Sequence, residues 1–457
     1  MTDDSEYVSR RKYLAWASAA TGGAMALAGC TGGQDQGSSN QSQGGRNNQS
    51  TGSSNQSGDG SSNNSELELQ HWWTAGGDGE AMTALLDRFK EKNPNIKVTE
   101  NPVGGAGGQN LHNVIQNRVL NNNPPSTWQD WPGENLQPYA QADKLKDIGD
   151  IWTEKKRNAY LDGPKLQARA GDSENPFYAV PLNIHRINNL FYNVELVEEA
   201  GVDPTSFGNP QDLIDAMDTI ESETDAAGMG QETSSAQGTL QLFSVTLLGE
   251  AGVDTFQQFI GGNTDGIEDA VTSALETVKS YSEYYTQDAG SINQDEAGYK
   301  VANGEAAFMN QGDWQAGNFE TIDGFDYESG WRHVPWPGTK GYYQLNMDGF
   351  PFPKNNPSPN ATRKFLEFVG TVEAQEIFNP LKGSIPPRSD VPKEDFGPFL
   401  KKQIEQFNNS EAQPPSIAHG LALPPDTLNN LTEGMANFIS GYNIQKAQQN
   451  IIDIVSE

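Results

Sequence analysis

Residues 66–100 read ELELQHWWTAGGDGEAMTALLDRFKEKNPNIKVTE and place a helix pattern between two strand patterns. Residues 66–73 alternate in polarity, which predicts a strand. Apolar side chains recur at helical spacing over residues 80–92, and an Asn-Pro-Asn turn ends this predicted helix. Residues 96–99 are the second predicted strand. The chain therefore begins its regular structure as strand, helix, strand.

The same order continues beyond this stretch. A helix pattern covers residues 111–120, and a short strand is predicted over residues 127–130. Strands that alternate with helices form a mostly parallel sheet, and ligands of such sheets bind beyond the carboxyl ends of the strands. Here those ends are Trp72-Trp73-Thr74 and Gln129-Asp130-Trp131.

Two later segments read as extended crossings between lobes. Residues 177–193, FYAVPLNIHRINNLFYN, are strand-like and are interrupted by Pro181. Residues 350–354, FPFPK, form the second crossing. Further helices are predicted over residues 210–220, 267–285, 361–369 and 372–378.

The charge of the chain limits its partners. Its 457 residues carry 61 acidic and 30 basic side chains, a net charge of −31, and residues 1–65 are nearly neutral. This balance argues against nucleic acid, which needs a basic face, and against anionic lipid bound through a basic patch. Molar salt, with a Debye length of about 3 Å, screens the self-repulsion of such a body. The composition is typical of a halophile's protein.

The N-terminus reads as an export signal. SRRKYL at residues 9–14 is a twin-arginine pattern, and the following apolar run is too short for a spanning helix. The run ends in Leu-Ala-Gly-Cys at residues 27–30, which resembles a lipobox, and Cys30 is the chain's only cysteine. We expect residues 1–30 to be a twin-arginine lipoprotein signal peptide, with lipid on Cys30 and the protein anchored at the extracellular face of the membrane.

Residues 31–65 contain no apolar side chain and are expected to be a disordered polar tether. Catalytic signatures are not found. The five histidines lack metal-ligand spacing, and no nucleophile elbow, P-loop or dinucleotide motif occurs. The glycine run at residues 104–108 lacks a lysine and is expected to be a tight backbone passage. No cofactor, no metal and no catalytic residue are expected.

Aromatic and polar side chains coincide at predicted loops and strand ends. Sugars place C–H faces on aromatic rings and need carboxylates, amides and cations for their hydroxyl groups. The aromatic residues at these positions are five tryptophans, Trp72, Trp73, Trp131, Trp314 and Trp336. Any one of them could belong to the core, but five beside polar residues predict a sugar-binding site.

Seven motifs in fixed order carry a resemblance to a known family. They span nearly all of residues 66–457, and they resemble extracellular solute-binding proteins of ABC sugar transporters, in the branch related to maltose-binding protein and above all the glucose-binding lipoproteins. The motifs are HWWTAGG (71–77), PVGGAGG (102–108), PPSTWQDWPG (124–133), YAVPLNIHRINNLFYN (178–193), GEAAFMNQGDW (304–314), EAQEIFNPLKGSIPPR (373–388) and PSIAHG (415–420).

The resemblance implies an α/β fold of the type II periplasmic-binding-protein kind. Each of its two lobes is a mixed sheet flanked by helices, hinge strands join the lobes, and a sugar binds in the cleft without being chemically changed. Lobe 1 would comprise residues 66–180 with 350–385, and lobe 2 residues 181–349 with 386–457.

The resemblance also implies the residues that contact the sugar. Close relatives have a histidine where this chain has Trp131, which leaves the identity of the sugar open. Trp314 would stack on the sugar from the second lobe, and His185 would line the cleft from the crossing. The full set is Trp72, Trp73, Glu80, Gln129, Trp131, His185, Trp314, Asp348, Lys382 and His419.

We therefore expect a monomeric lipoprotein that captures glucose or a similar monosaccharide and delivers it to an ABC permease with its cytoplasmic ATPase. Three alternatives remain open. A secreted glycoside hydrolase or lyase would need two carboxylates across the scissile bond. A binding protein for an oligosaccharide or for glycerol phosphate is the second, although a phosphate would want more cations than Lys382 and Arg388. A surface protein without a ligand is the third, and the aromatic strand ends disfavour it.

Overall fold

A computed structural model describes residues 66–105 and 108–456 of the chain. The predictions of a signal peptide, of a lipid on Cys30 and of a polar tether concern residues outside this range, as do residues 106 and 107 of the glycine run. Among the described helices, none combines the length and the apolar character needed to cross a membrane.

The first sheet has the strand order β2-β1-β3, and its three strands are parallel, as predicted. β1 ends earlier than predicted, so that His71, Trp72 and Trp73 lie past the end of the strand. Leu67 and Leu69 of β1 are fully buried in one apolar cluster with Phe89 of α2. The elements are β1 (Glu66–Gln70), α2 (Gly76–Lys92), β2 (Lys97–Glu100), α3 (Gln109–Leu120) and β3 (Thr127–Trp128).

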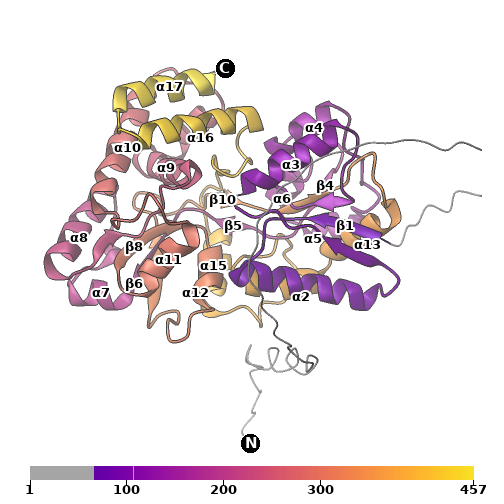
Figure 1. Ribbon diagram of the computed structural model, residues 1–457, viewed down its shortest axis with the longest axis horizontal. Helices are drawn as coiled ribbons and strands as arrows, with labels where there is room; N and C mark the ends of the chain where they lie inside the picture. Colours follow the sequence, from indigo (N-terminus) through magenta and orange to yellow (C-terminus); the bar gives the residue numbers. More distant parts are fainter. Residues whose placement is uncertain (1–65, 106–107, 457) are drawn as a thin grey trace, which may run out of the picture. The chain divides into compact units, whose positions relative to one another are not determined.

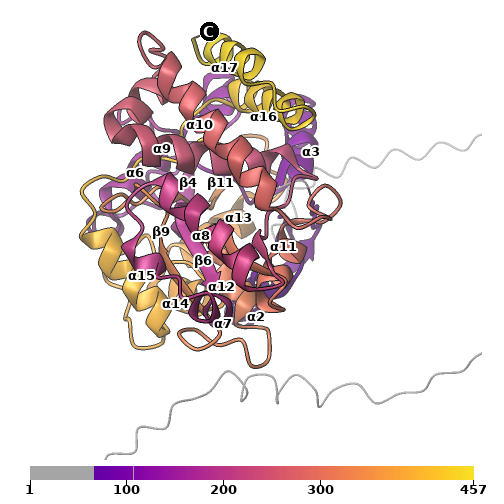
Figure 2. The ribbon, with the colours of Figure 1, turned by 90° about the vertical axis from the view of Figure 1, so that its left-hand side faces the viewer.

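The second sheet has the order β7-β8-β6-β9 and is mixed, because β7 runs parallel to β8 while β6 is antiparallel to both its neighbours. Figure 2 looks at this side of the molecule, where α7, α8 and α10 lie in front of the sheet. The strands are β6 (Asn189–Asn193), β7 (Ala227–Met229), β8 (Ala306–Gln311) and β9 (Trp331–Pro335).

Short antiparallel pairs connect the two sheets, and the predicted crossing over residues 177–193 consists of three short strands. β4 (Ala179–Pro181) pairs with β11 (Gly349–Pro351), and β5 (His185–Arg186) pairs with β10 (Leu345–Asn346). β5 and β10 lie between the two groups of helices in Figure 1. A bridge between Ile184 and Ile385 adds a third connection, and one between Asp130 and Gly349 adds an antiparallel neighbour to the first sheet.

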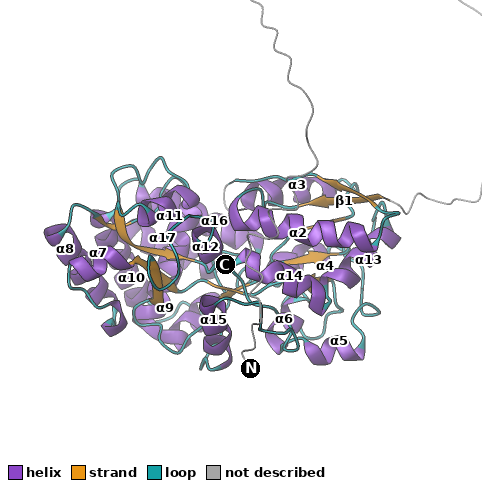
Figure 3. Cartoon of the chain, turned by 90° about the horizontal axis from the view of Figure 1, so that it is seen from below, coloured by secondary structure: helices purple, strands orange, loops and turns teal. Residues whose placement is uncertain are grey.

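The six predicted helices correspond to α2, α3, α8, α10, α13 and α14, and each begins and ends within four residues of its predicted bounds, whereas the other helices were not predicted. α2 and α14 lie side by side in Figure 3. The remaining helical elements are η2 (Glu134–Leu136), α4 (Gln137–Gln141), α5 (Glu154–Ala159), α6 (Asp162–Gln167), α7 (Val194–Glu199), η3 (Pro204–Ser206), α8 (Pro210–Glu223), α9 (Ala236–Ile260), α10 (Glu268–Tyr281), η4 (Ser282–Tyr284), α11 (Gln294–Ala302), α12 (Trp314–Phe319), α13 (Pro359–Val369), α14 (Val372–Lys382), α15 (Pro398–Asn408), α16 (Pro425–Ile439) and α17 (Ile444–Ser456).

Buried apolar side chains form three clusters. Two of them pack around the first sheet, and Trp73 and Trp128 belong to these. The largest packs around the second sheet and contains Trp314 and Trp336. Trp131 follows β3 of the first sheet and yet belongs to this largest cluster, so its side chain joins the two halves of the core.

Candidate functional site

The ends of β1 and β3 are tied together by one amide side chain. The Oε1 atom of Gln129 accepts a hydrogen bond from the backbone N–H of Trp72 at 3.0 Å. The Nε2 atom of the same Gln129 donates to Oδ1 of Asp348, also at 3.0 Å. Two strand ends of the first sheet are thereby connected to the segment between β10 and β11.

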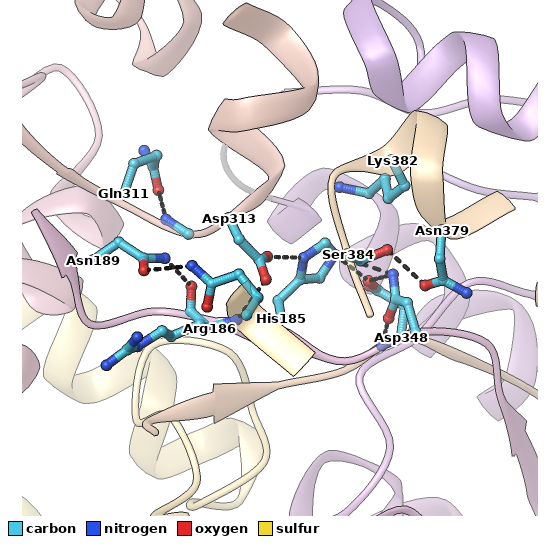
Figure 4. Close-up of polar contacts among 12 residues, drawn as sticks. His185, Arg186, Asn189, Gln311, Asp313, Asp348, Asn379, Lys382 and Ser384 are labelled. Atoms are coloured by element: carbon cyan, nitrogen blue, oxygen red, sulfur yellow. Dashed lines mark hydrogen bonds and ion pairs between the residues drawn. The ribbon is translucent and has the colours of Figure 1, made fainter. Parts of the chain in front are cut away.

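Asp348 belongs to a buried polar chain that continues to the second sheet. Its Oδ2 accepts a hydrogen bond from Nδ2 of Asn183 at 2.9 Å and lies 3.5 Å from Nε2 of His185. Nδ1 of His185 is 2.5 Å from Oδ1 of Asp313, whose Oδ2 accepts from the backbone N–H of Arg186. Figure 4 shows the imidazole of His185 between the two carboxylates. His185 is thus held on both sides, and its orientation is fixed.

The charges of this chain depend on one another. Burial and the neighbouring Lys382 would lower the pKa of His185, but Asp313 and Asp348 outweigh them and raise the pKa. Burial raises the pKa of Asp348 less than its contacts with His185, Lys382 and Gln129 lower it, so the net shift is downward. Both shifts favour a protonated His185 beside an ionised Asp348.

Lys382 brings a second buried cation to the same place. It is the last residue of α14, only 2% exposed, and its Nζ lies 2.8 Å from Oδ1 of Asp78. The ammonium is 5.8 Å from the ring centre of Trp73 and 5.6 Å from that of Trp314, within cation–π range of both. Gly383 follows with a φ of 77°, and a Cβ there would lie 2.7 Å from the carbonyl oxygen of Asp313. Only glycine lets α14 end this close to the second sheet.

Trp314 supplies an aromatic face from the second half of the molecule. It opens α12, is 7% exposed, and its ring centre is 5.1 Å from that of His185 and 5.5 Å from that of His419. Gly312 carries no Cβ that would collide with the ring. The buried indole N–H of Trp314 has no hydrogen-bond partner among the described residues. Such a donor is available for a polar ligand.

Four rings meet on the other side of the site. Trp131 lies edge-to-face with Trp72, His112 and His419, at centroid distances of 5.3, 4.7 and 5.3 Å. The buried carboxylate of Asp130 accepts from the backbone N–H of Trp131 at 2.9 Å and from further donors, including Trp128 and Asn135. The loop after β3 is thereby held so that Trp131 faces the second half.

We call this set of side chains the junction cluster. It comprises Trp72, Trp73, Asp78, His112, Gln129, Trp131, Asn183, His185, Asp313, Trp314, Asp348, Lys382 and His419. Nine of the ten residues expected at the site lie in it.

Glu80 and Trp336 lie elsewhere. Glu80 is exposed on α2, and the acid of that helix that reaches the cluster is Asp78. Trp336 is fully buried in the core of the second half, where its ring packs against Tyr281.

Sequence reasoning missed four members of the cluster: Asp78, His112, Asn183 and Asp313. Asp313 and Asn183 stand inside the motifs GEAAFMNQGDW and YAVPLNIHRINNLFYN, and Asp78 directly follows the motif HWWTAGG, so their neighbours were a usable signal. The place of His112 depends on contacts that its helix makes with Trp72 and Trp131. Within the described residues, no group of three or more His, Cys, Asp or Glu side chains has a geometry suited to a metal ion.

His419 gives the cluster a measurable pH response. Burial lowers the pKa of His419 to about 3, with Asp348 opposing and His185 adding to the shift, and its Nδ1 lies 2.7 Å from Oγ of Ser416. Because the unfolded side chain titrates near pH 6.5, the unfolded state binds one more proton between pH 6.5 and about pH 3. Stability is therefore lost as the pH falls through this window, by about 1.4 kcal/mol per pH unit from this one group.

His419→Gln is expected to reduce the slope of unfolding free energy against pH by about one proton between pH 6 and pH 4.5. Denaturant titrations at four pH values in molar salt measure this slope. The matched variant Ser416→Ala keeps the imidazole and should keep the slope. Equal slopes for wild type and His419→Gln would contradict the prediction.

Comparison with known proteins places this geometry in context. The model of the family described as bacterial extracellular solute-binding protein matches residues 73–376. The xylose/arabinose-binding protein of Haloferax volcanii is 39% identical over 460 residues, covering 99% of this chain and 98% of its own. An ABC transporter extracellular-binding protein of Pyrococcus horikoshii is 37% identical, covering 86% of this chain and 88% of its own.

Solved structures agree in fold. The bacterial solute receptor AcbH, whose structure is described with a preference for β-D-galactopyranose, superposes with a TM-score of 0.73 at 18% identity. The match covers 85% of this chain and 98% of the receptor. At that identity the likeness concerns the fold, which is the two-lobed α/β architecture that the sequence predicted.

Proposed function

The chain belongs to the family of bacterial extracellular solute-binding proteins, and we propose that it captures a sugar outside the cell for an ABC transporter. As a member of this family it is a binding protein and not an enzyme. The observation that carries the proposal is the junction cluster itself. Aromatic rings, a buried ammonium, carboxylates and an indole N–H without a partner combine in one place, which is the chemistry that sugar faces and hydroxyl groups require.

The proposed ligand lies between two lobes that close on it. Lobe 1 would consist of residues 66–180 with 350–385, and lobe 2 of residues 181–349 with 386–457. A ligand favours closure only if it binds the closed state better, so it must contact both lobes. Trp73 and Gln129 would contact it from lobe 1 and Trp314 from lobe 2. Asp348 and His185, at the crossings, would act as hinge-side contacts.

We propose a monosaccharide as the ligand, glucose or a similar sugar. The name of the Haloferax volcanii relative supports a second candidate, a pentose such as xylose or arabinose. Trp131 bears on this choice, because its indole takes up room in the proposed site. A pentose lacks the hydroxymethyl group of glucose and needs less room.

The remaining proposals concern location and partners. The loaded protein would dock as a monomer on a sugar permease that works with a cytoplasmic ATPase. The twin-arginine signal, lipid on Cys30 and the tether of residues 31–65 would hold it at the outer face of the membrane. The net charge of −31 supports the proposal that the protein works in concentrated salt.

Intrinsic tryptophan fluorescence, titrated with sugars in molar salt, tests the function. Four tryptophans of the junction cluster report on the site. A saturable change with glucose, xylose or arabinose is expected, together with none for glycerol phosphate. Absence of a response to every monosaccharide, combined with release of products from an oligosaccharide, would instead favour the glycoside hydrolase.

Closure itself can be tested at Gly317 of α12. A Cβ on Gly317 would lie 3.0 Å from the carbonyl oxygens of Leu381 and Lys382 across the proposed lobe boundary. Gly317→Ala should therefore weaken sugar binding, by roughly 5- to 30-fold for an overpacking cost of about 1–2 kcal/mol. Helix propensity favours alanine, so the free energy of unfolding should not fall.

The control for Gly317→Ala is Gly163→Ala, because a Cβ on Gly163 would meet no atom within 4 Å. Affinity is measured by the fluorescence titration, and stability by denaturant. A Gly317→Ala variant that binds sugar as well as wild type would contradict closure at this contact.

A further inference from the structure

A hollow on the surface shares no lining residue with the junction cluster. It has a volume of about 380 Å³ and is formed by α5, α6 and the segment that follows them. Figure 3 shows both helices on the side of the first sheet. Its lining contains three basic side chains and one acidic one, Asp162, together with apolar and neutral polar groups. The lining residues include Arg157, Asn158, Lys165, Arg169, Ser173 and Phe177.

Both arginines are fixed in place. Arg169 donates from NH1 to the carbonyl oxygens of Ser173 and Asn175 at 2.9 and 2.7 Å, and its guanidinium carbon lies 4.1 Å from the ring centre of Phe177. Arg157 donates to the carbonyl oxygen of Gly149 at 3.2 Å and lies 5.6 Å from the same ring. Guanidiniums held in this way lose little rotamer entropy when they bind an anion.

The ring between them is itself immobilised. Phe177 is buried and stacks on Trp152 with a centroid distance of 4.3 Å and an interplanar angle of 17°. The guanidinium carbons of Arg157 and Arg169 are both within 6 Å of this ring centre, so they lie less than about 10 Å apart. A rigid ring therefore supports two like charges on one side of the hollow.

Neither arginine forms an ion pair with a carboxylate in the part of the chain that the structure describes. Acidic side chains outnumber basic ones two to one in this chain. Of the other described arginines, five pair with a carboxylate, namely Arg88, Arg118, Arg332, Arg363 and Arg388. Arg186 does not, but it is buried and donates to Asn188 and Gln406 instead. Asp162 at the hollow pairs with Lys165 at 2.7 Å, and its own side chain is 99% exposed. The guanidiniums of the hollow keep donors for an outside anion.

The net charge of −31 gives no indication of a local anion-binding hollow. At the ionic strength expected for the protein, the Debye length is about 3 Å, so the distant acidic surface contributes little at the hollow. Direct contacts decide whether an anion binds there. A tetrahedral phosphate has enough oxygens to accept from both guanidiniums and from Lys165, whereas a carboxylate offers two.

We propose that this hollow binds a phosphate group, either as free phosphate or on the headgroup of an anionic lipid. The guanidiniums of Arg157 and Arg169 donate hydrogen bonds to the phosphate oxygens, and Lys165 and Asn158 supply the remaining donors. The site is separate from the proposed sugar site, and its occupant does not need to be transported.

The test uses the full chain with Cys30→Ser, so that no attached lipid contributes to membrane binding. Calorimetric titration with inorganic phosphate in 2 M NaCl measures free anion binding. Sedimentation with vesicles of phosphatidylglycerol and phosphatidylcholine, or of phosphatidylcholine alone, measures headgroup binding. We expect saturable binding in at least one assay and a loss of at least tenfold in the Arg157→Gln, Arg169→Gln double variant.

Control variants distinguish binding at this hollow from a general effect of positive charge on the protein. Arg332→Gln removes an arginine that pairs with Glu198 elsewhere and should change nothing. Arg157→Gln alone alters an exposed side chain, and it should weaken binding even if the double variant fails to fold. Phosphate binding without vesicle binding identifies the free anion, and sedimentation only with phosphatidylglycerol identifies the headgroup. Binding to neither probe, or equal binding by folded variants and wild type, overturns the proposal.

Discussion

Replacing Trp314 by alanine is expected to lower sugar affinity by roughly 30- to 1,000-fold, the range of about 2–4 kcal/mol typical of a buried aromatic hot spot. The side chain offers one ring face, an unpartnered indole N–H and a cation–π contact to Lys382. Alanine removes all three at once. The same change leaves Lys382 with Trp73 and Asp78, so the ammonium remains paired.

Two further variants distinguish the loss of the indole N–H of Trp314 from the loss of its ring, and a change at the site from the same change in the core. Trp314→Phe keeps a ring and loses the N–H, so its affinity should lie between wild type and Trp314→Ala. Trp336→Phe makes the same chemical change in the core of the second half and should leave sugar affinity unchanged, whatever it costs in stability. Titrations are read by calorimetry, because the variants change the fluorescence. Wild-type affinity in a folded Trp314→Ala protein would contradict the role of this residue.

The fold could be predicted because its signals are local. The alternation in residues 66–73 and the helical spacing that follows depend on near neighbours, and the first sheet has the predicted parallel order. The end of β1 was placed three residues too late, because His71 and Trp73 are buried outside the ladder. Burial alone does not distinguish a strand from a segment that packs just beyond one.

Most of the site residues could be predicted because they lie in the family motifs, and Asp348 is the exception. Glu80 was chosen as the acid near the tryptophans, but α2 begins at Gly76 and places Asp78 in its first turn, beside Lys382. A shift of two residues turns a helical side chain by about 200°, which is enough to exchange an exposed acid for a paired one. His112 reaches Trp131 from another helix, and that approach leaves no trace in sequence spacing.

Asp348→Ala is expected to lower the free energy of unfolding at pH 7 by about 3–5 kcal/mol, the cost of removing one partner from a buried charged network. Three groups lose their acceptor: the amides of Gln129 and Asn183 and the imidazole of His185. Each is buried, so water does not replace the lost contact freely. The crossing between the sheets is weakened at the same time, because Asp348 links the end of β3 to the segment before β5.

The pH dependence identifies the charge as the cause. The pKa of Asp348 is lowered in the folded protein, so its contribution is present above the unfolded value near 3.9 and is lost as the pH falls through the folded pKa. The deficit of Asp348→Asn, which keeps the shape and removes the charge, should therefore shrink below pH 4. His185 shifts the other way: its contribution is present below pH 6.5 and is lost as the pH rises through its raised pKa. Without Asp348 that pKa should fall.

An exposed ion pair provides the contrast for Asp348. Asp143 pairs with Lys354 on the surface, where its side chain is 82% exposed, and Asp143→Asn should cost no more than about 1 kcal/mol. Asparagine is used because Asp143 has a φ of 58°, which asparagine adopts more readily than alanine. Denaturant titrations of both variants in molar salt, at pH 7 and pH 3.5, measure the difference. Equal losses for Asp143→Asn and Asp348→Ala would mean that the buried chain from Gln129 to Asp313 adds nothing beyond a surface pair. Its burial, its several donors and the imidazole held between two carboxylates all argue for the larger loss.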